Sequence, residues 1–216
     1  MKLDELGVKF QTDKSSLLHN YLKLYERRLT HLVAEKFTLI EVGVFKGGSL
    51  ATWAEYFPQA TIVGVDIDPE CKQFEKGNAY VRIGDASDSS FIFDVVKEFG
   101  KPTVVIDDGS HRWDHQIATL QNLFPILLPD GLFIIEDIHT SFEGISSMEP
   151  FQAHSSISCF DYLQKLSRAV TAAEYLGKEK PFDLFIADQS QWVSSVEFAR
   201  KTAVLSKSLT KGSGPR

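Results

Sequence analysis

The chain has 216 residues, of which 43% are hydrophobic and 24% are charged. This length suits one domain with a short extension and is too small for two full α/β domains. The formal net charge of -6 argues against a nucleic-acid partner or an anionic membrane surface, because both favour a basic protein. A small neutral or hydroxylated molecule is the expected partner.

Cysteine content and apolar runs restrict the compartment. Cys71 and Cys159 stand far apart and in no metal-binding spacing, so neither a disulfide framework nor a structural zinc site is expected. The first residues lack the apolar core of a signal peptide, and no apolar run approaches the ~20 residues that span a bilayer. We therefore expect a cytoplasmic protein with no membrane partner.

Residues 1–36 are predicted to be a helical segment. Ser15 and Ser16 can cap a helix that carries an apolar stripe at helical spacing. This helix could fold over a ligand site in the following domain, or it could pack as an amphipathic helix on the edge of a sheet. The stripe consists of Leu17, Leu18, Tyr21, Leu22, Leu24 and Tyr25.

From Phe37 onward, short apolar runs alternate with amphipathic stretches. Runs such as 104–106 contain no polar residue, as expected for strands that are covered on both faces. The alternation predicts a doubly wound, Rossmann-like α/β fold, in which a mainly parallel sheet has helices on both faces. The predicted strands are 37–42, 61–66, 79–84, 103–107 and 131–136, and the predicted helices are 48–57, 69–76, 89–99 and 114–127.

The stretch 138–158 is rich in His, Ser, Glu and Gly and shows no period. A loop of this length is either an active-site lid or a disordered segment, and we prefer the lid. A helix is predicted near 159–176. Residues 193–199 and 202–206 then form an antiparallel hairpin, which brings the sheet to seven strands. The sheet domain is thus expected to span 37–208, followed by a disordered tail at 209–216.

A glycine loop from Glu41 to Ser49 follows the first strand and leads into a helix. Glycines at this place let the backbone approach a ligand and present amide groups at a helix N-terminus. The spacing GxxxGG differs from the GxGxxG of dinucleotide folds. The acidic residue before the loop suits a cofactor that carries a cation, such as the amino group of a methionine, and would repel a diphosphate.

Acidic residues also end the second and third strands, in GVDID and GDA. Asp66 is placed to hold ribose hydroxyls, and Asp85 to meet an adenine amino group. A glycine turn with acidic helix caps is the alternative. From about Phe37 to Glu136, this order of motifs is similar to class I S-adenosylmethionine-dependent methyltransferases. The predicted cofactor contacts at these strand ends are Glu41, Gly43, Gly47, Ser49, Asp66, Asp85 and Ala86.

Carboxylates follow the fourth and fifth strands, at Asp107, Asp108, Glu136 and Asp137. The carboxyl ends of strands beside the switch point of a doubly wound sheet form its ligand crevice. Four carboxylates there would repel one another unless a cation lies among them. Oxygen ligands without thiolates predict Mg²⁺, or else Mn²⁺ or Ca²⁺. Asp107 could instead cap its turn or position the cofactor, and we assign it to the cofactor.

A histidine, His111, follows three residues after Asp108. A bound dication can lower the pKa of a substrate hydroxyl, and an imidazole can then accept the proton as a general base. His111 could instead cap the next helix. His139 is a second candidate base, whereas His115 is expected to be structural.

Two longer motifs narrow the resemblance. The stretch from IDDGSH to IIEDIHTS, together with TDKSSLLHNYLKLYE near the N-terminus, resembles the metal-dependent sugar O-methyltransferases of macrolide biosynthesis. The same motifs occur in cephalosporin hydroxylase-like sequences. The resemblance implies magnesium on Asp108, Glu136 and Asp137, His111 as the base, and an N-terminal segment over the cofactor. The macrolide enzymes carry a large additional N-terminal domain that has no counterpart in this sequence.

The predicted function is therefore a magnesium- and S-adenosylmethionine-dependent O-methyltransferase. Its acceptor would be a hydroxyl on a sugar or polyol of a natural product or glycan, and a homo-oligomer is compatible with the sequence. A catechol-type O-methyltransferase and a non-catalytic S-adenosylmethionine-binding module are the alternatives. An oxidative enzyme is disfavoured because the 2-His-1-carboxylate pattern for iron is missing.

Overall fold

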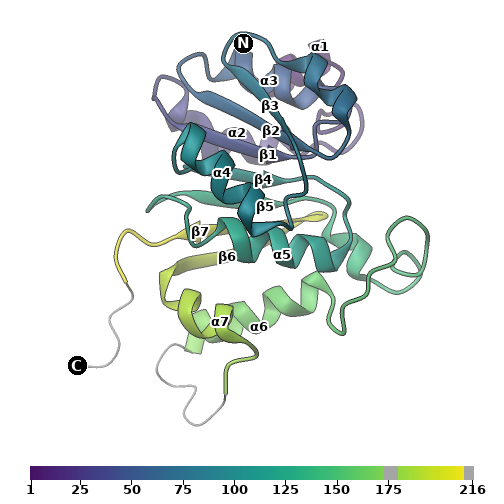
Figure 1. The fold of residues 1–216 in the computed structure, drawn as a ribbon, viewed down its shortest axis with the longest axis vertical. Coiled ribbons are helices and arrows are strands. Elements are labelled where there is room, and N and C mark those ends of the chain that lie inside the picture. Colours follow the sequence, from purple (N-terminus) through teal and green to yellow (C-terminus); the bar gives the residue numbers. More distant parts are fainter. Residues whose placement is uncertain (173–179, 212–216) are drawn as a thin grey trace. The chain divides into compact units, whose positions relative to one another are not determined.

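The computed structural model describes residues 1–172 and 180–211. The chain divides into two compact units, residues 1–102 and 103–216. The described residues form seven strands, three in the first unit and four in the second (Figure 1). The predicted tail at 209–216 and the end of the predicted helix 159–176 fall partly outside the described residues.

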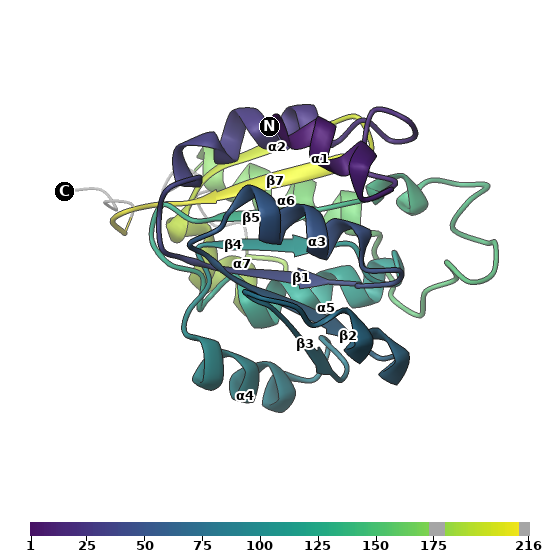
Figure 2. The same cartoon turned by 90° about the horizontal axis from the view of Figure 1, so that it is seen from above.

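The first unit contains three parallel strands, with β2 between β1 and β3. Gly64 of β2 lies against α3, because a Cβ there would come within 2.5 Å of Val44 and 3.1 Å of Leu50. Gly84, after β3, lies against α4 in the same way, because a Cβ there would come within 2.4 Å of the Phe91 ring. Figure 2 shows α3 and α4 on opposite faces of these strands. The elements are β1 (Thr38–Val42), α3 (Gly48–Tyr56), β2 (Thr61–Asp66), η2 (Pro69–Phe74), β3 (Ala79–Ile83) and α4 (Ser89–Phe99).

The N-terminal segment differs from the prediction. Its helices are α1 (Leu3–Lys9), α2 (Leu22–Leu29) and the short η1 (Thr30–Leu32). The prediction of a helix that begins after Ser16 is therefore wrong. Residues 16–20 form turns, and Leu17 and Leu18 are 73% and 67% exposed. At the end of these turns, Asn20 adopts a left-handed backbone with φ 61°, which interrupts the helical path.

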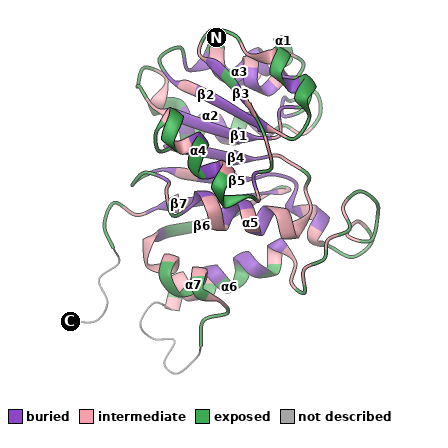
Figure 3. Ribbon diagram, viewed as in Figure 1, coloured by how far each residue is buried: buried purple, intermediate pink, exposed green. Residues whose placement is uncertain are grey.

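The second unit contains four strands in the order β4-β5-β7-β6. The β4–β5 pair is parallel, and β7 is antiparallel to both of its neighbours. The predicted C-terminal hairpin is thereby confirmed. β4 is buried throughout and β5 is buried except for the half-buried Leu132, as their largely apolar sequences predict (Figure 3). The elements are β4 (Val104–Asp107), α5 (Trp113–Leu123), β5 (Leu132–Ile135), η3 (Ile138–Ser141), α6 (Cys159–Ala172), α7 (Leu184–Gln189), η5 (Ser190–Trp192), β6 (Val193–Ala199) and β7 (Thr202–Lys207).

Within 1–172 and 180–211, no helix combines the length and the apolar character needed to cross a bilayer.

Candidate functional site

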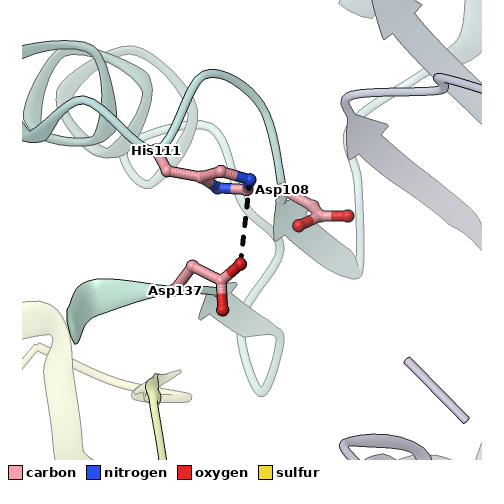
Figure 4. Close-up of side chains that lie close together, drawn as sticks. All are labelled: Asp108, His111 and Asp137. Atoms are coloured by element: carbon pink, nitrogen blue, oxygen red, sulfur yellow. Dashed lines mark ion pairs between the residues drawn. The ribbon is translucent and has the colours of Figure 1, made fainter. Parts of the chain in front are cut away.

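Three side chains of the second unit form a potential metal-binding group: Asp108, His111 and Asp137 (Figure 4). Each offers one ligand atom, and these atoms all lie within 4.8 Å of one another. His111 Nε2 is 3.7 Å from Asp137 Oδ2. Two carboxylates and an imidazole are a donor set that suits a divalent ion. Two of the predicted ligands and the predicted base therefore come together.

The register of β4 and β5 explains why these residues meet. Asp107 is paired with Ile135, and the Glu136 N–H donates to the Asp107 carbonyl oxygen at 2.9 Å. The loops that follow both strands consequently start side by side. His111 and Asp137 then take left-handed backbones, with φ of 56° and 53°.

A second histidine also faces Asp137. His139 Nδ1 is 3.6 Å from Asp137 Oδ1, while His111 is beside the other oxygen of the same carboxylate. Distance to Asp137 therefore does not separate the two candidate bases. His111 differs because it alone of the two belongs to the group with Asp108.

Asp107 and Glu136 lie outside this group in the described structure. Both are buried. Burial raises the pKa of Asp107 to about 7, with a further contribution from the charge of Asp108 and an opposing hydrogen bond from the Gly109 N–H. Asp107 as a cofactor contact and Glu136 as a metal ligand stay predictions.

Four buried side-chain atoms of residues 107–116 have no hydrogen-bond partner among the described residues. Such atoms are rare in folded proteins, and each needs an explanation. A cluster of them in one segment fits a place where a ligand or ion supplies the missing partners. The atoms are Asp107 Oδ2, His111 Nδ1, Trp113 Nε1 and Gln116 Oε1.

The segment after η3 lies next to the group. The Phe151 ring is 6.2 Å from the His111 ring, and the His154 N–H donates to Asp114 Oδ2 at 3.3 Å. His115, predicted to be structural, is 2.9 Å from the Ser110 hydroxyl. The proximity of Phe151 to His111 is compatible with a lid at 138–158, which stays a prediction.

In the first unit, Glu41 at the start of the glycine loop is completely buried. Its carboxylate accepts hydrogen bonds from the Ser49 hydroxyl at 2.9 Å and the Trp53 indole N–H at 3.0 Å. Lys14 Nζ lies 3.8 Å from Glu41 Oε1. The carboxylate therefore joins the N-terminal segment, β1 and α3, a role that sequence reasoning missed. Trp53 itself is completely buried in the core.

Asp66 holds the glycine loop from the end of β2. Its Oδ2 accepts the N–H groups of Val44 at 2.8 Å and Phe45 at 3.1 Å, and its Oδ1 accepts the Asp68 N–H at 2.9 Å. Burial acts to raise the pKa of Asp66, but these backbone hydrogen bonds outweigh it and the pKa lies below its usual value. Asp66 thus shapes the loop that is predicted to hold the cofactor.

The remaining predicted cofactor residues are two glycines of this loop and two residues that follow β3. Gly43 and Gly47 have φ of 91° and 73°, which glycine adopts readily. Asp85 is exposed and accepts the Ser87 N–H at 2.8 Å, and Ala86 is buried. A Cβ on Gly48 would be 2.7 Å from the Phe10 carbonyl oxygen, so the N-terminal segment packs against the start of α3.

An Asp66→Asn variant tests whether the Asp66 carboxylate shapes the glycine loop. Asparagine has one neutral oxygen and cannot accept all the hydrogen bonds that the two charged oxygens of Asp66 accept from backbone N–H groups. Because these bonds shape the loop that is predicted to hold the cofactor, we expect affinity for S-adenosylhomocysteine to fall about tenfold or more. Since the folded-state pKa of Asp66 is lowered, its contribution to stability is present above about pH 4 and is lost as the pH falls further. Urea unfolding from pH 7 to pH 3 should show the wild type and the variant converging in acid. A difference that stays constant down to pH 3 would contradict this account.

Comparisons with known proteins place this geometry in context. No family model matches the chain. It is 33% identical over 147 residues to the 8-demethyl-8-(2-methoxy-alpha-L-rhamnosyl)-tetracenomycin-C 3'-O-methyltransferase of Streptomyces olivaceus. It is 32% identical over 147 residues to the mycinamicin VI 2''-O-methyltransferase of Micromonospora griseorubida. Each alignment covers 65% of this chain and 37% of the relative, so the chain spans little more than a third of these proteins.

The solved structure of the MycE methyltransferase from the mycinamycin biosynthetic pathway, in complex with Mg and SAH, superimposes with a TM-score of 0.82. The match covers 96% of this chain and 55% of MycE, at 25% identity. The chain has the class I methyltransferase fold. The predicted doubly wound α/β architecture is thereby confirmed. The homologues named above are sugar O-methyltransferases of macrolide and tetracenomycin pathways. A second MycE structure also contains mycinamycin VI.

Proposed function

We propose that this chain is a magnesium-dependent O-methyltransferase that transfers the methyl group of S-adenosylmethionine to a hydroxyl of a sugar or polyol. The observation that carries the proposal is the group of Asp108, His111 and Asp137, in a chain whose homologues are sugar O-methyltransferases. A carboxylate-and-imidazole group distinguishes this proposal from a module that only binds the cofactor. The identity of the homologues favours a sugar over a catechol.

Asp108 and Asp137 would hold the ion, with Glu136 as a further ligand. The two carboxylates of the group supply the oxygen ligands that a hard dication prefers. When bound, magnesium would lower the pKa of the acceptor hydroxyl.

His111 Nε2 would accept the hydroxyl proton, and Asp137, 3.7 Å away, would stabilise the resulting imidazolium. The acceptor oxygen forms a bond to the methyl carbon as the carbon–sulfur bond breaks. Methyl transfer would leave a neutral thioether in place of the sulfonium, so the reaction needs no oxidant or reductant.

The cofactor would lie on the glycine loop of the first unit. Gly43 and Gly47 would let the loop follow the methionine part, since both have the positive φ that glycine adopts readily, while Asp66 and Asp85 would meet the ribose and the adenine. Glu41 and Ser49 would support the loop through their mutual hydrogen bond, and Ala86 and Asp107 complete the proposed contacts. The acceptor is a small hydroxylated, sugar-containing molecule, and the net charge of -6 makes nucleic acid an unsuitable partner.

Metal removal tests the proposal. With S-adenosylmethionine, Mg²⁺ and mycinamicin VI as the probe acceptor, we expect methyl transfer that EDTA abolishes and excess Mg²⁺ restores. Calorimetry in EDTA should still detect S-adenosylhomocysteine binding, because none of the proposed cofactor residues is a member of the metal group. Turnover that survives exhaustive chelation would refute the proposed metal dependence. Absence of binding heat would refute the proposed cofactor. A parallel assay with a catechol tests the alternative acceptor.

A further inference from the structure

We propose that Thr140 is a positioning residue that sets the geometry of the metal group through the backbones of His111 and Asp137. The inference rests on the proposed function, because it concerns the same metal group. Thr140 belongs to η3 and is 1% exposed. Thr140 lies in the IIEDIHTS stretch, but the sequence predicts no role for its side chain.

The hydroxyl of Thr140 lies between the two loops that carry the group. Its Oγ1 is 2.7 Å from the carbonyl oxygen of His111 and 3.1 Å from the carbonyl oxygen of Asp137. A hydroxyl has one hydrogen to donate, so the two carbonyls share it, with the shorter contact to His111. The Thr140 N–H also donates to the Asp137 carbonyl at 3.1 Å. One residue therefore fixes the peptide groups that follow both His111 and Asp137.

The conformation of those two residues makes the contact important. His111 and Asp137 both have left-handed backbones, with φ of 56° and 53°. Residues with side chains adopt this region infrequently and hold it when the surrounding structure restrains them. Rotation of either residue toward an ordinary φ would swing its side chain away from the other. The 3.7 Å separation of His111 Nε2 and Asp137 Oδ2 thus depends on the restraint that Thr140 supplies.

A hydroxyl deletion tests the inference. Thr140→Val keeps the shape of the side chain and removes the donor, whereas Thr140→Ser keeps the donor. Thr202→Val is a matched control, because Thr202 is buried in the same unit and its hydroxyl has no hydrogen-bond partner among the described residues. The readout is the Kd of Mn²⁺, measured by electron paramagnetic resonance on the cofactor-free protein, with circular dichroism to verify folding.

We expect Thr140→Val to bind Mn²⁺ about tenfold or more weakly, which is the usual effect of losing a group that orients metal ligands. Thr140→Ser and Thr202→Val should bind as the wild type does. Thr140→Ala serves as a second hydroxyl deletion if valine impairs folding. Equal Mn²⁺ affinity in the wild type and a folded deletion variant would overturn the role of Thr140 and leave the metal site standing. No Mn²⁺ binding by the wild type would instead remove the metal on which the proposed function depends.

Discussion

Replacement of His111 by alanine is expected to lower kcat by about 10²- to 10⁴-fold, the usual contribution of a general base. The ring lies 3.7 Å from Asp137, close enough for that carboxylate to stabilise the protonated imidazole. Without the ring, the acceptor proton must pass to water. Because a base acts on the chemical step, the KM for S-adenosylmethionine should change little. Steady-state kinetics at saturating Mg²⁺ measure both quantities.

Two other histidines provide the controls. His115→Ala removes a ring that is hydrogen-bonded to Ser110 and does not belong to the metal group. The kcat of this variant should therefore stay near that of the wild type. His139→Ala removes the other ring beside Asp137. If His139→Ala loses more turnover than His111→Ala, the base is His139. If His111→Ala loses Mn²⁺ affinity in proportion to its turnover, His111 is a metal ligand and its role as a base is refuted.

The strands and most helices of the central fold were predictable because their signals are local. Residues 61–66 and 89–99 were predicted with the bounds that the structure shows. An uninterrupted apolar run reports a strand covered on both faces. Asp88 caps α4 by accepting the Ser90 N–H at 2.8 Å, which is a signal that the sequence itself displays.

The N-terminal segment was harder because its conformation depends on distant contacts. Ser15 and Ser16 have the sequence of a helix cap, yet Ser16 N–H donates to Asp4 of the preceding helix at 2.7 Å. The Lys14 carbonyl accepts the Tyr21 N–H at 2.8 Å and so closes a turn where a helix was expected. α7 was also missed, since six residues are too few to show a helical period.

In the candidate site too, residues with a local sequence signal were predictable and residues that depend on distant contacts were not. Asp108 and Asp137 could be identified because each lies within two residues of the end of a predictable strand, and the structure brings them together with His111. Thr140 and Lys14 could not, since their roles arise from contacts with residues distant in the sequence. A buried threonine or a lysine carries no local mark of such a partner.

Lys14→Met should therefore destabilise the protein strongly, by about 3–5 kcal/mol, the typical effect of removing one partner of a buried ion pair. Lys14 and Glu41 have side-chain exposures of 1% and 0%, with Nζ and Oε1 separated by 3.8 Å. The neutral donors of Ser49 and Trp53 would remain, but they do not replace the lost charge. The free energy of unfolding from urea titration measures the loss, and Glu41→Gln in the same chain should recover part of it.

Lys9→Met is the matched control for Lys14→Met. It tests whether the burial of an ion pair, and not the distance between its charges, determines the loss of stability. Lys9 and Glu55 approach to 2.7 Å, closer than the buried pair, but their side chains are 48% and 42% exposed. Water already solvates both charges, so the control should change the free energy of unfolding by less than about 1 kcal/mol. If the two substitutions have equal effects, the Lys14–Glu41 pair does not hold the glycine loop, and the loop must be shaped by Asp66 and the backbone alone.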